Sequence, residues 1–135
     1  MSGIAINPGV ARYVDLGPGP EFAGVARRFG RRVLSAWGLG RLADDVEQIT
    51  GELVANAIPG GEYRLTLYLD LRTAVLRVEV ADQRKGKPEQ RRPCDDDEHG
   101  RGLWIVETLA DSWGYEETAR GNRVWAELHV RRGLK

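Results

Sequence analysis

TGELVANAI, residues 50–58, has the composition and spacing of the last turns of a helix. Glu52 and Asn56 are four residues apart, so both side chains project from one helical face. Leu53 and Val54 can then turn toward a core. A carboxylate that can take a proton, beside an amide oxygen that can face Mg²⁺, suits phosphate chemistry. An exposed polar pair on an ordinary amphipathic helix explains the same residues, so the rest of the chain has to decide between the two interpretations.

The composition indicates one soluble globular domain. The chain has 135 residues, of which 41% are apolar and 30% charged, and its formal net charge is zero. Because there is no basic excess, we expect no direct nucleic-acid partner and no membrane partner. The single cysteine, Cys94, cannot form an internal disulfide, and no apolar run reaches the roughly 20 residues of a membrane helix. Together with the lack of a signal-peptide pattern, these features indicate a cytoplasmic protein.

The first part of the chain predicts a leader, a strand and a helix. Residues 1–9 are small and polar and are interpreted as a loose leader, which leaves a single domain over residues 10–135. Alternation predicts a short strand over residues 12–16. A helix is predicted over residues 21–37, because apolar side chains recur at helical spacing, at Phe22, Ala26, Phe29, Val33 and Trp37.

A second helix and a hairpin follow. The helix is predicted over residues 43–58, where apolar side chains again recur at helical spacing, and Pro59 ends it. Residues 63–71 and 74–81 each alternate between apolar and polar side chains. The short connection between them predicts an antiparallel hairpin with one apolar face.

The last third of the chain predicts a lid, a helix and a second hairpin. Residues 83–101 have almost no aliphatic side chains to bury, and we interpret this segment as a lid. A third helix is predicted over residues 100–110, followed by strands over 113–117 and 124–130. This order of elements predicts an α+β fold, a two-layer sandwich with three helices on one face of a mixed, mostly antiparallel sheet.

Three features along the chain could share one chemistry. The first is the helix that carries Glu52 and Asn56. The second is Asp82, where a buried strand ends, because a carboxylate there can accept a hydrogen bond from an exocyclic amine such as that of adenine. The third is Gly-Arg-Gly, residues 100–102, at a helix start, where backbone N–H groups can approach phosphate oxygens. Each feature also has an ordinary explanation, as a turn residue or a tight loop-to-helix turn.

The order and spacing of these motifs resemble those of the GHKL (Bergerat-fold) ATPases. ELVANA, residues 52–57, resembles the N box of that family. VEVAD, residues 78–82, resembles the strand that leads into the first glycine box, and HGRGL, residues 99–103, resembles the second glycine box. More narrowly, the chain looks like the bacterial anti-sigma-factor serine/threonine kinases and the small histidine-kinase-like ATPase domains.

The resemblance implies a role for each matching residue. Glu52 is expected to be the general base that activates the attacking hydroxyl, Asn56 to hold Mg²⁺ and Asp82 to bind the adenine amine. The other expected contacts to ATP come from the lid and the helix start, at Gly86, Gly100, Arg101 and Gly102. The implied cofactors are therefore ATP and Mg²⁺, and the implied reaction is transfer of the γ-phosphoryl group.

The resemblance also implies partners. In this family the phosphate acceptor is usually a serine or threonine of a small anti-anti-sigma (STAS-type) protein. The kinase usually binds a sigma factor as well and keeps it from RNA polymerase. A homodimer is left open, because the family often dimerises. The helix over residues 21–37 and the sheet edge are the candidate surfaces.

Several positions depart from the family pattern. Pro59 ends the N-box helix early, and Arg84 stands where the first glycine box usually has its first glycine. We place Arg123 where the last strand often has a threonine beside the adenine pocket. The acidic run over residues 95–98 is unusual for a lid over a triphosphate. These departures favour an alternative function, a non-catalytic regulator of the same fold that binds a partner protein and binds ATP weakly or not at all.

Overall fold

The computed structural model describes residues 9–17, 21–55, 62–82, 104–118 and 121–131. These residues form five strands, two long helices, a short 3₁₀ turn and a helical segment over 104–109. The elements with full bounds are β2 (Gly9–Leu16), α1 (Phe22–Ala36), η1 (Gly40–Leu42), α2 (Ala43–Ala55), β3 (Tyr63–Asp70), β4 (Val75–Asp82), β5 (Ser112–Thr118) and β6 (Gly121–His129).

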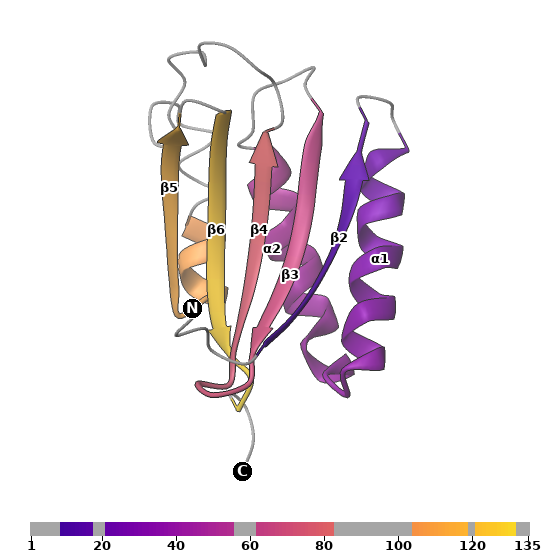
Figure 1. Cartoon of the computed structure of the whole chain (residues 1–135), viewed down its shortest axis with the longest axis vertical. Helices are drawn as coiled ribbons and strands as arrows, with labels where there is room; N and C mark the ends of the chain where they lie inside the picture. The colour runs from indigo at the N-terminus through magenta and orange to yellow at the C-terminus, as the bar shows by residue number, and fades with distance from the viewer. Residues whose placement is uncertain (1–8, 18–20, 56–61, 83–103, 119–120, 132–135) are drawn as a thin grey trace, which may run out of the picture.

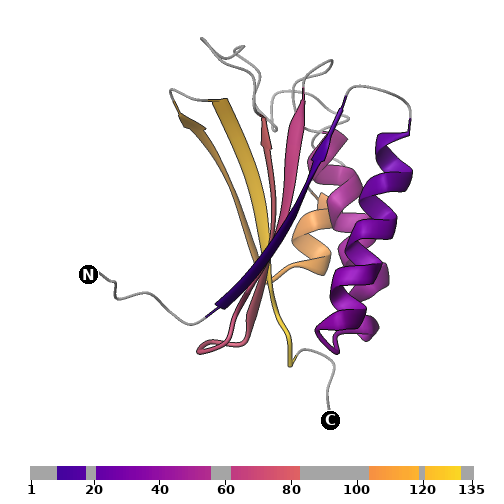
Figure 2. The ribbon, with the colours of Figure 1, turned by 45° about the vertical axis from the view of Figure 1, so that its right-hand side comes forward.

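The strands form one open sheet in the order β2-β3-β4-β6-β5. All four pairings between these strands are antiparallel, so the described part of the sheet is antiparallel rather than mixed. The predicted α+β architecture is confirmed, since α1, α2 and the segment over 104–109 all lie on one face of the sheet (Figure 2). Both hairpins predicted from alternation are present, as β3–β4 and β5–β6.

The core lies between the helices and the sheet. Alternate residues of β3, β4 and β6 are buried on the face that the helices cover, as the alternating pattern predicts. From α2, Ile49 and Leu53 enter this layer and are 0% exposed. Burial of a side chain of this size contributes about 1.5–3 kcal/mol, so α2 is fixed against the sheet by its apolar stripe.

Local signals set the ends of the two long helices. After α1 the chain turns through Gly38, whose φ is +74°, and Leu39 N–H donates to Leu34 O at 2.7 Å. The left-handed conformation of Gly38 lets this N–H satisfy a free carbonyl at the helix end. Asp44 and Asp45 lie in the first turn of α2, where the helix dipole favours negative charge. The predicted end of α2 at Pro59 lies outside the described residues.

Strand β2 is longer than predicted, because it begins at Gly9 rather than at Arg12. Its pairing with β3 runs from Gly9 opposite Asp70 to Leu16 opposite Tyr63, so the last residue of the expected leader belongs to the sheet. The strand lies at the sheet edge, and most of its side chains are exposed. An exposed edge strand has little alternation of apolar and polar side chains, which explains why the sequence predicts a strand shorter than β2.

The other face of the sheet is lined by charged and aromatic side chains. The Arg77 guanidinium lies over the Trp125 ring at 4.3 Å and makes ion pairs with Glu79 at 3.2 Å and Glu127 at 3.0 Å. On the edge side, Arg64 lies over the ring of Tyr13 at 3.9 Å. None of the described helices is long and apolar enough to cross a membrane.

Candidate functional site

The predicted site residues that are described lie toward one end of the sheet. Helix α2 runs upward in Figure 1, and its last described turn lies at the same end as the tip of β4 and the start of β6. Because α2 packs against both β4 and β6, its C-terminal turn carries side chains to the edge of the helix–sheet layer. The antiparallel order of β4 and β6 brings the end of one strand beside the start of the other.

Asp82 is the last residue of β4 and is buried, with 6% of its surface exposed. It lies opposite Tyr63 of β3 and continues the alternation of Leu76, Val78 and Val80, which all face the helices. The carboxylate is therefore held on the helix side of the sheet, where it can accept a hydrogen bond from an amine that enters the layer. The structure confirms that Asp82 ends a buried strand, and its contact with the adenine amine stays a prediction.

Asn122 is a candidate site residue that the sequence analysis missed. In the register of β4 with β6, Ala81 lies opposite Arg123, and one further step brings Asn122 opposite Asp82. Only 8% of Asn122 is exposed, and neither its amide nitrogen nor its carbonyl oxygen has a hydrogen-bond partner among the described residues. A buried carboxamide without partners is rare in a folded protein and calls for an explanation.

Arg123, which the sequence places beside the adenine pocket, does not face the helix side of the sheet, where Asp82 lies. On β6, Val124, Ala126 and Leu128 face the helices, so Arg123 points to the other side of the sheet. There its Nε donates to Glu116 at 2.9 Å, and its Nη1 lies 3.7 Å from Glu79. The alternation of β6 contains the signal, because the apolar residues at 124, 126 and 128 place 122, and not 123, on the helix side.

The end of the sheet thus presents one row of side chains across its five strands. The register joins Leu16, Tyr63 and Asp82 on one side and Asn122 and Glu117 on the other, and one step beyond the last β4–β6 pair, Ala81 with Arg123, links the two groups. Leu16 and Tyr63 are 2% and 6% exposed, so the row passes from apolar to polar across the sheet. A row with an apolar part and two neighbouring hydrogen-bonding groups can hold a flat heterocycle by its edge.

Glu52 lies on the last described turn of α2 and is half-buried. Its neighbours Leu53 and Val54 are buried in the core, as predicted, so the helix holds the carboxylate at the margin of the layer. Glu52 also borders a shallow recess with Gln48 and Glu47. The position is compatible with a carboxylate that takes a proton from a substrate near the end of the sheet.

Five predicted nucleotide contacts lie outside the described residues, namely Asn56, Gly86, Gly100, Arg101 and Gly102. The predicted lid, Pro59, Arg84, Cys94 and the acidic run over 95–98 also lie outside them. Among the described residues there is no group of three or more His, Cys, Asp or Glu side chains that could hold a metal ion. The predicted Mg²⁺ ligand, Asn56, stays a prediction.

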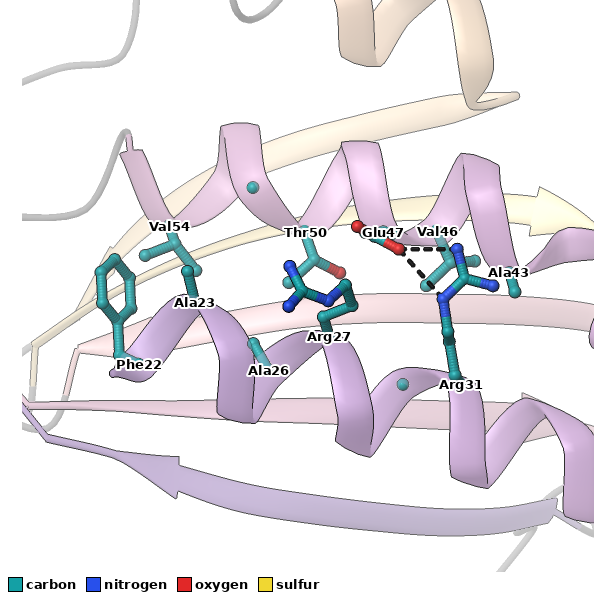
Figure 3. Close-up of a pocket in the computed structure, with 12 residues that line it drawn as sticks. Phe22, Ala23, Ala26, Arg27, Arg31, Ala43, Val46, Glu47, Thr50 and Val54 are labelled. Carbon is teal, nitrogen blue, oxygen red and sulfur yellow. Dashed lines mark hydrogen bonds and ion pairs between the residues drawn. The ribbon is translucent and has the colours of Figure 1, made fainter. Parts of the chain in front are cut away.

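A groove of about 210 Å³ lies between α1 and α2. No residue of the sheet lines it, so it is separate from the row that contains Asp82. Figure 3 shows that Arg31 crosses the groove from α1 to Glu47 of α2, at 2.8 Å, and it also pairs with Asp44 at 2.7 Å. The hydrogen bond to Asp44, followed by that to Glu47, raises the pKa of Arg31 above its ordinary value. Arg31 therefore ties the two helices together on their outer side.

The described residues fit a purine nucleotide at its base. Asp82 supplies a buried acceptor, and the Asn122 amide supplies an adjacent group whose hydrogen bonds the described residues do not satisfy. Such a pair matches the exocyclic amine and ring nitrogen of an adenine edge. Glu52, at the same end of the layer, lies on the helix that the sequence assigns to the phosphates.

Comparison with known proteins agrees with this geometry. The family model of the histidine kinase-like ATPase domain matches residues 19–128. A search of curated proteins found no match. Among solved structures, the crystal structure of the RsbU and RsbW domains of Rv1364c from Mycobacterium tuberculosis has the same fold, with a TM-score of 0.65 at 18% sequence identity. That match covers 89% of this chain and 32% of the other, so this chain spans about a third of its length. Because the family model covers most of the sequence, the chain belongs to the histidine kinase-like ATPase domain family.

Proposed function

We propose that this domain is an anti-sigma regulatory factor that binds Mg-ATP and phosphorylates a serine or threonine of an anti-anti-sigma protein. The observation that carries the proposal is the buried Asp82 carboxylate at the end of β4, beside the unsatisfied Asn122 amide and at the same end of the layer as Glu52. Membership of an ATPase family supports ATP as the nucleotide. The resemblance to anti-sigma kinases supports the acceptor and the second partner, a sigma factor that the protein binds.

Each described residue has one task in the proposed reaction. Asp82 accepts a hydrogen bond from the exocyclic amine of the base and so fixes the nucleotide at the end of the sheet. Glu52 accepts the proton of the attacking serine or threonine hydroxyl. At the same time the hydroxyl oxygen bonds to the γ-phosphorus, and the bond between the γ-phosphorus and the β,γ-bridging oxygen breaks. ADP and the phosphorylated side chain are the products. Bound Mg²⁺ supplies charge neutralisation at the phosphates, with Asn56 as the expected ligand.

A non-catalytic regulator of the same fold is the second candidate. Three sequence features favour it, at Pro59, Arg84 and Arg123. Arg123 gives this candidate less support, because its side chain faces away from the helix side of the sheet, where the base is proposed to bind. Pro59 and Arg84 lie outside the described residues and still support this candidate.

Substitution of the proposed base tests the function. In Glu52→Ala, transfer of labelled phosphate from ATP to purified STAS-type proteins should fall by about 10²–10⁴-fold, because the proton of the acceptor loses its base. Affinity for ATP, measured by calorimetry, should stay within about two-fold, since the proposed contact to the base comes from Asp82 and the proposed role of Glu52 is proton transfer. Gln48→Ala, an exposed change one turn earlier on α2, is the matched control and should retain transfer.

Three outcomes separate the candidates. Loss of transfer in Glu52→Ala alone supports the kinase. Retained transfer in that variant removes Glu52 as the base. Tight ATP binding without transfer by the unchanged protein to any STAS-type protein favours the non-catalytic regulator.

A further inference from the structure

We propose that Asn122 is the specificity-determining residue of the base site, where its side-chain amide donates a hydrogen bond to the N1 atom of adenine. This inference rests on the proposed binding of ATP. It names the residue that hydrogen-bonds to N1, the ring atom next to the carbon that bears the exocyclic amine. Asp82 then accepts from the neighbouring exocyclic amine. The two side chains together recognise one donor and one acceptor on adjacent atoms of the ring.

Burial is the first argument. Asn122 is 8% exposed, and its amide nitrogen and carbonyl oxygen are both without partners among the described residues. Removing an amide from water without replacing its hydrogen bonds destabilises the folded state. An apolar side chain at this position would continue the buried run of Val124, Ala126 and Leu128 without that cost. A group that lowers stability in this way is typical of a binding site.

Position is the second argument. The last pair of the β4–β6 ladder is Ala81 with Arg123, so Asp82 and Asn122 are the next residues along the two strands, where continuation of the antiparallel register sets them opposite each other, and both are buried. Directly opposite residues of an antiparallel pair have Cβ atoms about 4.5–5.5 Å apart. Two polar groups at that separation can bind neighbouring atoms of one heterocycle. Tyr63, on the other side of Asp82, is buried and bounds the row toward β2.

Chemistry is the third argument. On its Watson–Crick edge adenine presents the amine at position 6 as a donor and N1 as an acceptor. A carboxylate can only accept, so Asp82 matches the amine, whereas an asparagine amide nitrogen can donate to N1. Each side chain therefore contacts the atom that the other cannot. Loss of one such hydrogen bond in a buried site lowers affinity strongly, because its partner is left unpaired.

A nucleotide that lacks N1 tests the contact at the level of one atom. In 1-deaza-ATP a C–H group replaces N1, while the amine that Asp82 binds is retained. The unchanged protein should bind ATP about 5- to 100-fold more tightly than 1-deaza-ATP in titration calorimetry. In Asn122→Leu this ratio should fall to about one. The variant has no amide donor, so replacing N1 of the nucleotide by C–H removes no hydrogen bond.

Thermal unfolding without nucleotide gives an independent result. Asn122→Leu should unfold at a higher temperature than the unchanged protein, by a few degrees, because an unsatisfied amide has been replaced by an apolar group. Val124→Ala, two residues along the same buried face, is the matched control. It should unfold at a lower temperature and keep the full preference for ATP over 1-deaza-ATP.

The outcomes distinguish this inference from the proposed function. If the unchanged protein binds no ATP, the proposed function fails, and the inference fails with it. If it binds ATP but the preference over 1-deaza-ATP persists in Asn122→Leu, ATP binding stands and Asn122 does not read N1. A lower unfolding temperature for Asn122→Leu also overturns the inference, since the amide then has a partner within the chain.

Discussion

Two neighbouring residues of β6 differ in role because a strand turns successive side chains to opposite faces. Asn122 lies on the helix side of the sheet, next to Asp82, and Arg123 lies on the open side between Glu79 and Glu116. Motif spacing alone cannot decide which of the two residues faces the helices, because they are adjacent in the sequence. The alternation of the apolar residues that follow in β6 does separate them, and that signal is present in the sequence.

Removal of the Arg123 side chain tests this assignment. Arg123→Ala should change ATP affinity by less than about two-fold, because the guanidinium pairs with acidic groups on the face away from the base. Titration calorimetry of the variant beside the unchanged protein measures this. A loss of affinity of ten-fold or more would put Arg123 back in the base pocket and contradict the register described above.

At the scale of elements, periodicity predicted the buried parts of the fold well. Helices α1 and α2 and strands β3 and β4 follow their apolar patterns, because each buries one face against the same core. Edge strand β2 was predicted too short, since its exposed side chains show little alternation. The order β4-β6-β5 could not be read from local pattern, because it depends on which hairpin edge pairs with β4. The sequence therefore points to Asp82 as a candidate, but not to Asn122, whose place beside it depends on that strand order.

The packing of β5 on β6 has one tight contact that can be tested. A methyl group on Gly114 would collide with the indole ring of Trp125. The ring cannot easily move, because Arg77 lies over it and is held in turn by Glu79 and Glu127. Gly114→Ala should therefore lower the free energy of unfolding by about 1–3 kcal/mol.

Gly51 of α2 provides the control for this prediction. A methyl group there meets no atom within 4 Å, and the residue is exposed on a helix. Gly51→Ala should raise the free energy of unfolding by about 0.5–1 kcal/mol, because alanine favours the helix and restricts the unfolded chain. Denaturant titration measures both variants. Equal stability of the two would show that Trp125 moves aside, and the β5–β6 contact would not be tight.

At the scale of the whole molecule, the described candidate site residues of the helix layer and the sheet lie toward one end. The row from Leu16 to Glu117 crosses all five strands. Glu52 belongs to α2, whose last described turn lies at the same end as the tip of β4 (Figure 1). The groove between α1 and α2 lies in the helix layer and is lined by no residue of the sheet (Figure 3). The proposed nucleotide site and the outer helix surface are thus different parts of the fold, which suits the proposed binding of ATP and a partner.

The most direct test of the account is titration calorimetry of the unchanged protein with ATP, in the presence and absence of Mg²⁺. We predict binding in the micromolar range that depends on Mg²⁺, because Asp82 and Asn122 hold the base and the metal neutralises the phosphates. Micromolar binding would also stabilise the fold by about 2.7 kcal/mol at a ligand concentration 100 times Kd. Absence of binding at millimolar ATP would contradict the account and would leave a regulator that acts through its protein surfaces.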